Sequence, residues 1–337
     1  MTQSDVWNIK AALDWTAQYL AQKHDENPRL SAEWLVGCAC ELSRIELYVN
    51  YDRPLSKEER ACLRDYVTRR AAGEPLQYIT GEVGFRHITV KVKPGVLIPR
   101  PETEVLVSTA LSLLPEPTHG WEEALAASEA ALDAQLTSDD EDAAEAETSS
   151  KHEDATETEM PSEADTLRVV DLCTGSGCIA CSLAYEHPQI QVIATDIAPE
   201  AVSLAQENAR HLGLGGRVAV LRCDLAEKIP ERLMGTFDLV ISNPPYIPTA
   251  ILPTLSSEVR DFEPTLALDG GEDGNDFVRR ILPWAEKALK PGGVFALELH
   301  ETCLDAAFDY ALSLGFSKVT ITKDLTGAPR ILSGQKQ

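Results

Sequence analysis

Apolar residues in the first 75 positions of the chain have helical spacing. From Ile9 to Leu20 they recur every three or four positions, which is typical of a helix with one face in a core. Ser56, followed by Glu58 and Glu59, has the form of a helix start. We expect helical elements near residues 6–20, 31–42, 44–49 and 56–72. In the second helix, we expect four side chains to face the core: Trp34, Leu35, Cys38 and Leu42.

The pattern changes after residue 75. Residues 78–92 alternate between apolar and polar side chains and contain two glycines, which predicts a β-hairpin within a linker over residues 76–93. Pro99 and Pro101 exclude a regular helix until after Pro101, where a helix through Leu113 is expected. The first 75 residues are therefore expected to be a small helical domain, separate from the rest of the chain.

Beyond residue 166, short apolar runs alternate with helical stretches. The runs predict strands at residues 167–172, 191–195, 217–222, 237–242 and 293–299, with two closing strands at 318–322 and 330–333. This rhythm is typical of an α/β fold with a Rossmann-like, doubly wound and mostly parallel sheet. We expect it to form one domain over residues 94–337.

Charge is concentrated in one part of the chain. The net charge is −24, and residues 116–165 hold seventeen acidic residues and one lysine. This low-complexity segment has few large apolar side chains, so we expect a disordered insertion, with a short helix at 121–136 as the alternative. The remainder is mildly acidic and lacks a basic stripe, which argues against a nucleic-acid substrate.

Targeting signals and metal-ligand patterns are both missing from the sequence. No apolar stretch approaches the roughly 20 residues needed to span a bilayer, and the N-terminus does not resemble a secretory signal. We therefore expect a cytoplasmic protein without membrane contact. Cys178 and Cys181 have C-x-x-C spacing, but no second pair completes a zinc site, so we expect reduced thiols and no metal.

Acidic residues and glycines mark the ends of the first three predicted strands. Asp171 ends the first strand and is followed by Gly175 and Gly177, which let the backbone approach a ligand closely. Asp196 ends the second strand nineteen residues after Gly177, where a carboxylate can hold ribose hydroxyls, and Asp224 follows the third strand. Ligands bind at this end of parallel strands, so the pattern predicts a site for a nicotinamide cofactor or S-adenosylmethionine.

The order of these residues resembles that of Rossmann-like methyltransferases. Their D-x-x-x-G-x-G pattern begins at Asp171 in this chain. The resemblance implies that Asp171 lies near the cationic methionine end of S-adenosylmethionine, Asp196 at the ribose and Asp224 beside the adenine. Cys173 stands where these enzymes commonly have glycine, so we expect this position not to need a left-handed backbone.

The fourth strand leads into Asn243-Pro244-Pro245-Tyr246, the most specific motif in the chain. The prolines fix two successive φ angles and hold Asn243 extended, which makes a rigid loop. The Asn243 side-chain oxygen and a backbone carbonyl can accept the N–H groups of a planar nitrogen, while the Tyr246 ring stacks on its plane. This arrangement favours methylation of either an adenine amino group or a glutamine amide.

Further motifs distinguish these two substrates by resemblance. The chain is similar to the release factor glutamine methyltransferases (the PrmC/HemK family) in its order of domains and in five stretches: residues 78–81 with Phe85, 97–104, 262–264, 268–274, and 323–325 with Arg330. The resemblance covers nearly the whole chain except 116–165. It implies a substrate-recognition role for residues 1–75, and methylation of the glutamine in the Gly-Gly-Gln motif of peptide-chain release factors.

The resemblance also implies the site residues. Cofactor contacts would fall on Asp171, Cys173, Thr174, Gly175, Ser176, Gly177, Asp196, Asp224, Leu225 and Asn243. The glutamine would contact Asn243, Pro244, Pro245 and Tyr246, of which Asn243, Pro244 and Tyr246 would be catalytic. Residues 99–104 would border the pocket or form a packed linker.

Three other functions fit part of the sequence. An adenine-amino methyltransferase acting on DNA or RNA shares the Asn243 motif but predicts a basic surface. A catalytically inactive module that docks on translation factors leaves the intact motif and strand-end acids without a role. A nicotinamide-dependent dehydrogenase leaves Asn243-Pro244-Pro245-Tyr246 unexplained.

Overall fold

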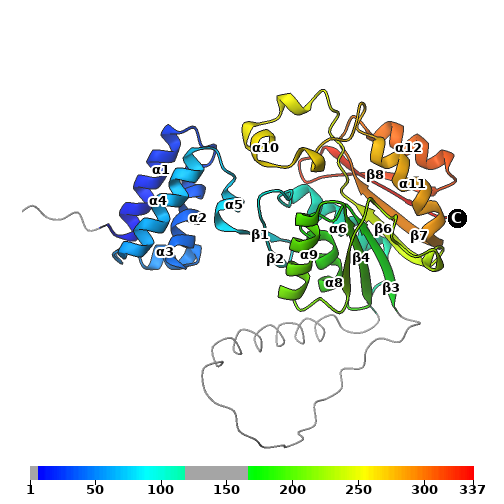
Figure 1. The fold of residues 1–337 in the computed structure, drawn as a ribbon, viewed down its shortest axis with the longest axis horizontal. Coiled ribbons are helices and arrows are strands. Elements are labelled where there is room, and N and C mark those ends of the chain that lie inside the picture. The colour runs from blue at the N-terminus through cyan, green and yellow to red at the C-terminus, as the bar shows by residue number, and fades with distance from the viewer. Residues whose placement is uncertain (1–6, 118–165) are drawn as a thin grey trace, which may run out of the picture. The chain divides into compact units, whose positions relative to one another are not determined.

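The computed structural model describes residues 7–117 and 166–337 (Figure 1). Contacts divide the chain into two compact units. The first unit holds Met1–Val83, Lys91–Ile98 and Pro253–Pro264, and the second holds Gly84–Val90, Pro99–Leu252 and Thr265–Gln337, as far as these ranges are described. Residues 118–165 of the predicted acidic insertion, including the alternative helix at 121–136, lie outside the described residues.

Among the described residues, the first unit has five helices before the hairpin. They are α1 (Ile9–Gln22), α2 (Pro28–Cys40), α3 (Arg44–Val49), α4 (Lys57–Ala71) and α5 (Leu76–Thr80). Ser56 starts α4 as predicted: its hydroxyl accepts the Glu59 amide at 3.0 Å, and the Glu59 carboxylate accepts the Ser56 amide at 2.7 Å. Apolar side chains from α1, α2 and α4, among them Leu13, Leu35 and Leu63, form the core of this unit.

Trp34 does not face that core. Its side chain is 47% exposed, whereas Leu35 beside it is fully buried. The buried stripe of α2 runs through Ala32, Leu35, Val36 and Ala39, and Trp34 lies about 100° around the helix from Leu35. The prediction for Trp34 was therefore wrong, because the core stripe passes on one side of it.

The hairpin is shorter than the predicted one. Its strands are β1 (Glu82–Phe85) and β2 (Ile88–Lys91), while residues 76–80 of the expected linker form α5. Tyr78 on α5 is buried, and its hydroxyl donates to the Val96 carbonyl at 2.7 Å. Tyr78 therefore anchors the segment that comes after the hairpin.

A distant part of the chain belongs to the same unit. Helix α10 (Ser257–Phe262) lies within its third segment. The half-buried Arg70 guanidinium of α4 forms ion pairs with Asp25 at 2.6 Å and with Glu258 of α10 at 3.0 Å. Phe262 packs against the small cluster of Tyr78, Val92 and Ile98. Residues far apart in sequence thus complete the helical unit.

The described part of the second unit contains a seven-stranded sheet with the order β5-β4-β3-β6-β7-β9-β8. The strands are β3 (Leu167–Leu172), β4 (Ile190–Asp196), β5 (Val218–Arg222), β6 (Phe237–Ser242), β7 (Leu289–Glu298), β8 (Ser317–Lys323) and β9 (Pro329–Gln335). Strands β3 to β7 pair in parallel, and β9 pairs antiparallel with both β7 and β8. This topology confirms the predicted doubly wound, mostly parallel α/β fold.

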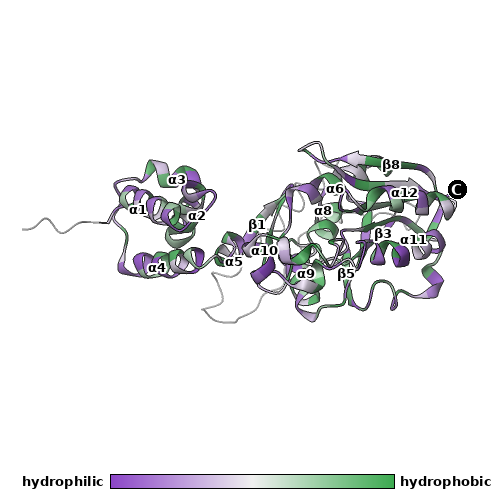
Figure 2. Cartoon of the chain, turned by 90° about the horizontal axis from the view of Figure 1, so that it is seen from above, coloured by the Kyte–Doolittle hydropathy of each residue, from purple (hydrophilic) through white to green (hydrophobic). Residues whose placement is uncertain are grey.

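Helices cover both faces of this sheet (Figure 1). One face carries α6 (Pro101–Leu113), α8 (Cys178–Glu186) and α9 (Pro199–His211), and the other carries α11 (Asp276–Ala288) and α12 (Leu304–Ser313). All six residues of β6 are buried, as expected for a central parallel strand. Hydrophilic residues lie on the outer sides of the helices in Figure 2. Within the described residues, none of the helices has the length and apolar character needed to cross a bilayer.

The last two strands are joined by a turn that Asp324 organises. Its carboxylate accepts the Thr326 hydroxyl at 2.6 Å and the backbone amides of Thr326 and Ala328 at 2.9 and 3.0 Å. Arg330 donates to its other oxygen at 3.3 Å. These contacts give the Lys323-Asp324-Leu325 and Arg330 motif a structural role in closing the sheet edge.

Candidate functional site

The predicted site residues lie at the carboxyl ends of neighbouring parallel strands. Leu172 of β3 pairs with Thr195 of β4 on one side and with Ser242 of β6 on the other. The Ser242 hydroxyl donates to the Leu172 carbonyl at 2.6 Å, which fixes the ends of β3 and β6 against each other. The glycine loop after β3, the acid that ends β4 and the Asn243 loop after β6 therefore share one edge of the sheet.

Asp171 is a fully buried carboxylate at this edge. Its Oδ2 accepts the Thr174 hydroxyl at 2.6 Å, while Oδ1 has no hydrogen-bond partner among the described residues. Burial raises the pKa of Asp171 to about 7, against the opposing effect of the Thr174 hydrogen bond. A buried carboxylate oxygen without a partner suits the cationic end of S-adenosylmethionine, so this residue fits the implied cofactor.

The loop after β3 turns through three left-handed residues. Cys173 has φ of 58°, Gly175 has 56° and Gly177 has 80°. The expectation that Cys173 avoids the left-handed region was wrong. The next residue, Thr174, donates its amide to the Thr195 carbonyl at 2.9 Å, and this tie to β4 holds the turn despite the cost of the Cys173 side chain.

Gly177 allows the loop to pass close to helix α9. A Cβ at this position would lie 3.0 Å from the Ala205 Cβ, so a larger residue would push the loop and α9 apart. Asn208 of the same helix donates to the Ser176 carbonyl at 2.8 Å. Helix α9 thus supports the loop from behind, and residues 173–177 form one continuous turn beside Asp196.

Asp196 binds two backbone amides of this edge. Its Oδ2 accepts the Gly175 amide at 2.9 Å, and Oδ1 accepts the Ala198 amide at 2.9 Å. Burial raises the pKa of Asp196, and the Ala198 and Gly175 amides act against that rise. Each oxygen of an ionised carboxylate retains a further lone pair, so ribose hydroxyls could donate to the same group. Asp196 therefore shapes the glycine loop as well as offering acceptors to a ligand.

Asp224 and Leu225 lie just after β5. Asp224 accepts a hydrogen bond from Arg280 of α11 at 2.7 Å and remains one-third exposed. Leu225 is buried in the core beneath the edge, with a left-handed φ of 46°. Their roles beside the adenine stay predictions.

The Asn243 loop is attached to Thr103, which belongs to the 99–104 stretch expected to border the pocket or form a packed linker, and to Glu298, which the sequence analysis did not single out. The Asn243 side-chain amide nitrogen donates to the Thr103 hydroxyl of α6 at 3.0 Å. The Thr103 hydroxyl donates to Oε2 of Glu298 at 2.7 Å, and the Tyr246 hydroxyl donates to Oε1 of Glu298 at 3.1 Å. Glu298 is fully buried at the end of β7, so a fourth strand end contributes an acid to this edge. Its position at the end of an apolar strand is the feature by which the sequence could have identified Glu298 as a site residue.

A second segment supports the loop through its backbone. The Ile247 amide donates to the Leu268 carbonyl at 2.9 Å, and the Gly270 amide donates to the Ile247 carbonyl at 2.8 Å. The Thr249 amide donates to the Gly271 carbonyl at 2.9 Å. The Asp269-Gly270-Gly271 part of the 268–274 motif therefore runs beside the residues that come after Tyr246.

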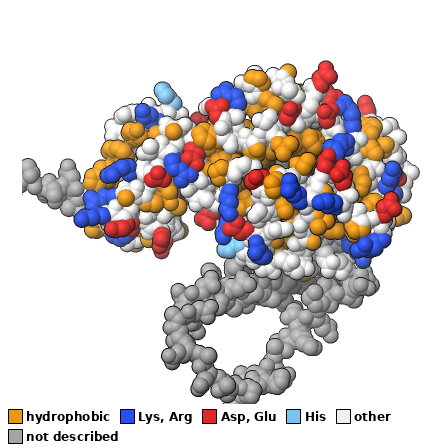
Figure 3. Space-filling model, viewed as in Figure 1, with side chains coloured by type: hydrophobic (Ala, Val, Ile, Leu, Met, Phe, Trp, Pro, Cys, Tyr) orange, Lys and Arg blue, Asp and Glu red, His pale blue; other side chains and the backbone are white. Residues whose placement is uncertain are grey.

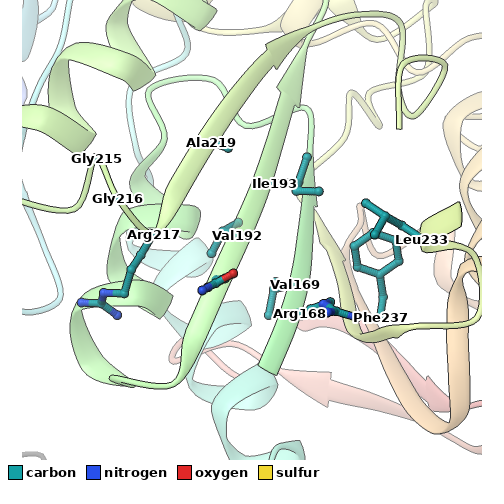
Figure 4. A pocket seen from close by; sticks show the side chains of 11 residues that line it. Arg168, Val169, Val192, Ile193, Gly215, Gly216, Arg217, Ala219, Leu233 and Phe237 are labelled. Atoms are coloured by element: carbon teal, nitrogen blue, oxygen red, sulfur yellow. The ribbon is translucent and has the colours of Figure 1, made fainter. Parts of the chain in front are cut away.

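A pocket elsewhere in the second unit contains none of the predicted site residues (Figure 4). It has a volume of about 230 Å³ and is lined by the first residues of β3, β4 and β5, with Leu233 and Phe237. It therefore lies toward the amino ends of these strands, away from the edge that carries Asp171 and Asn243. On the face shown in Figure 3, basic and acidic side chains are interspersed.

Both the helical part and the sheet part of the chain match known protein families. Residues 11–81 match the PrmC N-terminal domain, and residues 163–326 match a methyltransferase domain. Release factor glutamine methyltransferases from Geobacter sulfurreducens and Moorella thermoacetica are 39% and 38% identical to the chain, each covering at least 96% of both sequences. The one from Koribacter versatilis is 34% identical over 97% of this chain and 98% of its own length. The chain belongs to the release factor glutamine methyltransferase family.

Proposed function

We propose that this enzyme transfers a methyl group from S-adenosylmethionine to the side-chain amide nitrogen of the Gly-Gly-Gln glutamine in peptide-chain release factors. Family membership over the full chain supports the reaction and its substrate. The observation that carries the assignment to a site is the position of Asn243, next to the buried strand-end acids and with its amide nitrogen bound to Thr103. That contact leaves the Asn243 oxygen for another partner.

The loop residues act on the glutamine amide. S-adenosylmethionine, when bound, supplies a methyl group on a positively charged sulfur. The amide nitrogen is a weak nucleophile because its lone pair is delocalised into the carbonyl. The Asn243 oxygen and the Pro244 carbonyl accept its N–H groups and favour the positive charge that grows on nitrogen as it attacks. As the new N–C bond forms, the bond between the methyl group and sulfur breaks, and the nitrogen then releases one proton. Pro245 keeps the loop rigid, and the Tyr246 ring holds the amide plane in line with the methyl group.

The cofactor residues have separate roles in this proposal. Asp171 would hold the cationic methionine end, together with the backbone of residues 173–177. Asp196 holds the ribose, while Asp224 and Leu225 border the adenine. Asn243 adjoins both the cofactor and the glutamine, which brings the methyl group and its acceptor together.

The same proposal extends to domains and partners. Residues 1–75 recognise the release factor, residues 76–93 link the domains, and residues 94–337 carry the chemistry. Release factors act on ribosomes, so we expect the enzyme in the cytoplasm. The mildly acidic sequence outside 116–165 and its lack of a basic stripe support the expectation of no direct nucleic-acid binding.

Mass spectrometry of a release factor incubated with enzyme and S-adenosylmethionine tests the function. We expect one added methyl group on the Gly-Gly-Gln glutamine, and none on a release factor in which that glutamine is replaced by glutamate. Asn243→Ala should lower kcat by roughly 10²-fold or more while cofactor affinity stays close to that of the unmodified enzyme. Methylation at another residue, or an Asn243→Ala enzyme with normal kcat, would overturn the proposal.

A further inference from the structure

We propose that Thr103 and Glu298 are positioning residues, which orient the Asn243 amide and the Tyr246 ring through hydrogen bonds of fixed direction. This inference rests on the proposed role of Asn243. The four residues joined by these bonds come from α6, β7 and the loop after β6, and Thr103 and Glu298 are 195 positions apart in sequence. Thr103 and Glu298 are both buried, with exposed fractions of 2% and 0%.

The direction of the bonds starts at Glu298. The hydrogen bonds from Thr103 and Tyr246 and the nearby Arg330 favour the ionised form of Glu298 against its burial. In that form the carboxylate can only accept hydrogen bonds, so both hydroxyls that contact it donate. Thr103 has one hydroxyl proton, and the 2.7 Å contact to Glu298 uses it. The Thr103 oxygen can then only accept from Asn243. The amide nitrogen of Asn243 must therefore face Thr103, and its oxygen must face away.

This direction matters because a side-chain amide has two nearly isosteric ends. If the Asn243 amide were rotated by half a turn, its oxygen would meet the Thr103 oxygen, which has no proton left to donate. Its NH₂ group would take the place of the acceptor that the substrate amide needs. The bond to Thr103 therefore excludes the orientation of Asn243 in which its NH₂ group would face the NH₂ group of the substrate glutamine.

The same carboxylate also restrains Tyr246. Its Oε1 accepts the Tyr246 hydroxyl at 3.1 Å, which fixes the outer end of the ring. Burial raises the pKa of Glu298, but the hydrogen bonds from Thr103 and Tyr246 and the nearby Arg330 act against that rise. Glu298 thus fixes the orientation of Asn243, through Thr103, and of Tyr246, the two loop side chains proposed to face the substrate.

The test compares variants that keep or remove each bond. Thr103→Val removes the hydroxyl at nearly constant shape, and we expect kcat to fall by about 10-fold or more with cofactor affinity within about 3-fold. Thr103→Ser returns the hydroxyl and should recover most of that loss. Glu298→Gln places an N–H group against one of the two hydroxyls and should lower kcat by about 10-fold or more. Thr109→Val, a matched change on the same helix, should leave kcat within about 2-fold.

A double variant separates positioning from general destabilisation. If Thr103 acts through Asn243, Thr103→Val should cost less than about 2-fold in single-turnover rate when added to Asn243→Ala, because residues that act as a unit are not additive. Full additivity in the double variant would overturn the proposal. So would a Thr103→Val or Glu298→Gln enzyme that is folded by circular dichroism and keeps normal kcat.

The controls distinguish this inference from the function on which it rests. If the unmodified enzyme does not methylate the glutamine, or Asn243→Ala is fully active, the proposed function fails. If both behave as expected and the Thr103 and Glu298 variants are unaffected, only the positioning role fails. Should Thr103→Val not fold, Glu298→Gln and the recovery in Thr103→Ser relative to Thr103→Ala decide the result.

Discussion

Gly270 packs its α-carbon directly against the backbone of Tyr246, where an added Cβ would lie 2.6 Å from the Tyr246 Cα and 2.9 Å from the Pro245 carbonyl oxygen. Both neighbours are backbone atoms of the Asn243 loop, so neither can move aside without moving the loop. We predict that Gly270→Ala lowers kcat/KM by about 10-fold or more, since about 1.4 kcal/mol of lost transition-state binding is tenfold in rate. Steady-state kinetics with a release factor measures this.

Gly216→Ala is the matched control for that prediction. A Cβ at Gly216 would meet no described atom within 4 Å, and the residue does not have a left-handed φ. Its kcat/KM should stay within about 2-fold of the unmodified enzyme. Equal kinetics for Gly270→Ala and Gly216→Ala would show that the loop does not depend on the close packing of Gly270.

The left-handed backbone of Cys173 predicts an unusual order of stability between two substitutions. Cys173→Gly and Cys173→Ala both remove the thiol, but alanine keeps the strained φ of 58° with a Cβ attached. We expect the glycine variant to be the more stable by about 1 kcal/mol, reduced somewhat by the freedom of glycine in the unfolded chain. Chemical denaturation of the two variants gives the difference directly. An alanine variant at least as stable as the glycine variant would mean that this turn carries no strain.

Asp171 gives a pH dependence with a definite sign. Its pKa is raised from 3.8 to about 7 by burial, so between these values the folded protein holds a proton that the unfolded chain has lost. The contribution of this group to the free energy of unfolding is fully present below about pH 4 and is lost as the pH rises through about 7. Asp171→Asn has no such titration. Measured without cofactor, the Tm of the unmodified enzyme should fall relative to that of Asp171→Asn between pH 5 and 8, and parallel curves would contradict the buried, shifted carboxyl.

Asp196 should contribute to cofactor affinity in two ways. Asp196→Ala removes the proposed ribose contact and also both amide contacts at 2.9 Å, so we expect S-adenosylmethionine binding to weaken by roughly 1.5–3 kcal/mol. Asp196→Asn keeps one carbonyl acceptor, so its affinity for S-adenosylmethionine should lie between those of the unmodified enzyme and Asp196→Ala. Calorimetry measures the affinities, with the exposed Asp305→Asn as a control. Unchanged binding in Asp196→Ala would place the ribose elsewhere.

Strands and strand-end residues were the most predictable part of the molecule. β3 and β6 have the predicted bounds, because central parallel strands are buried on both faces and read as continuous apolar runs. Asp171, Asp196 and Asn243 could be found because they lie at the ends of such runs. Helix α5 was missed, since five residues are too few to show a helical period among the alternating residues of the predicted hairpin.

Contacts across the chain were the least predictable part. The hydroxyl of Thr103 meets a carboxylate 195 residues away, and its neighbours in sequence give no sign of this partner. The prediction for the Cys173 backbone was wrong for a related reason. Its own preference is against a left-handed backbone, but the tie between Thr174 and β4 outweighs that preference.

Arg70, which binds both Asp25 and Glu258, has a consequence for any attempt to exchange the helical unit between relatives. The first unit is assembled from three stretches of chain, so the polypeptide passes between units five times. A transplant of residues 1–83 alone would separate Glu258 from Arg70 and Phe262 from Tyr78. Chimaeras should therefore carry residues 91–98 and 253–264 together with the N-terminal helices, and the three stretches should vary together among relatives.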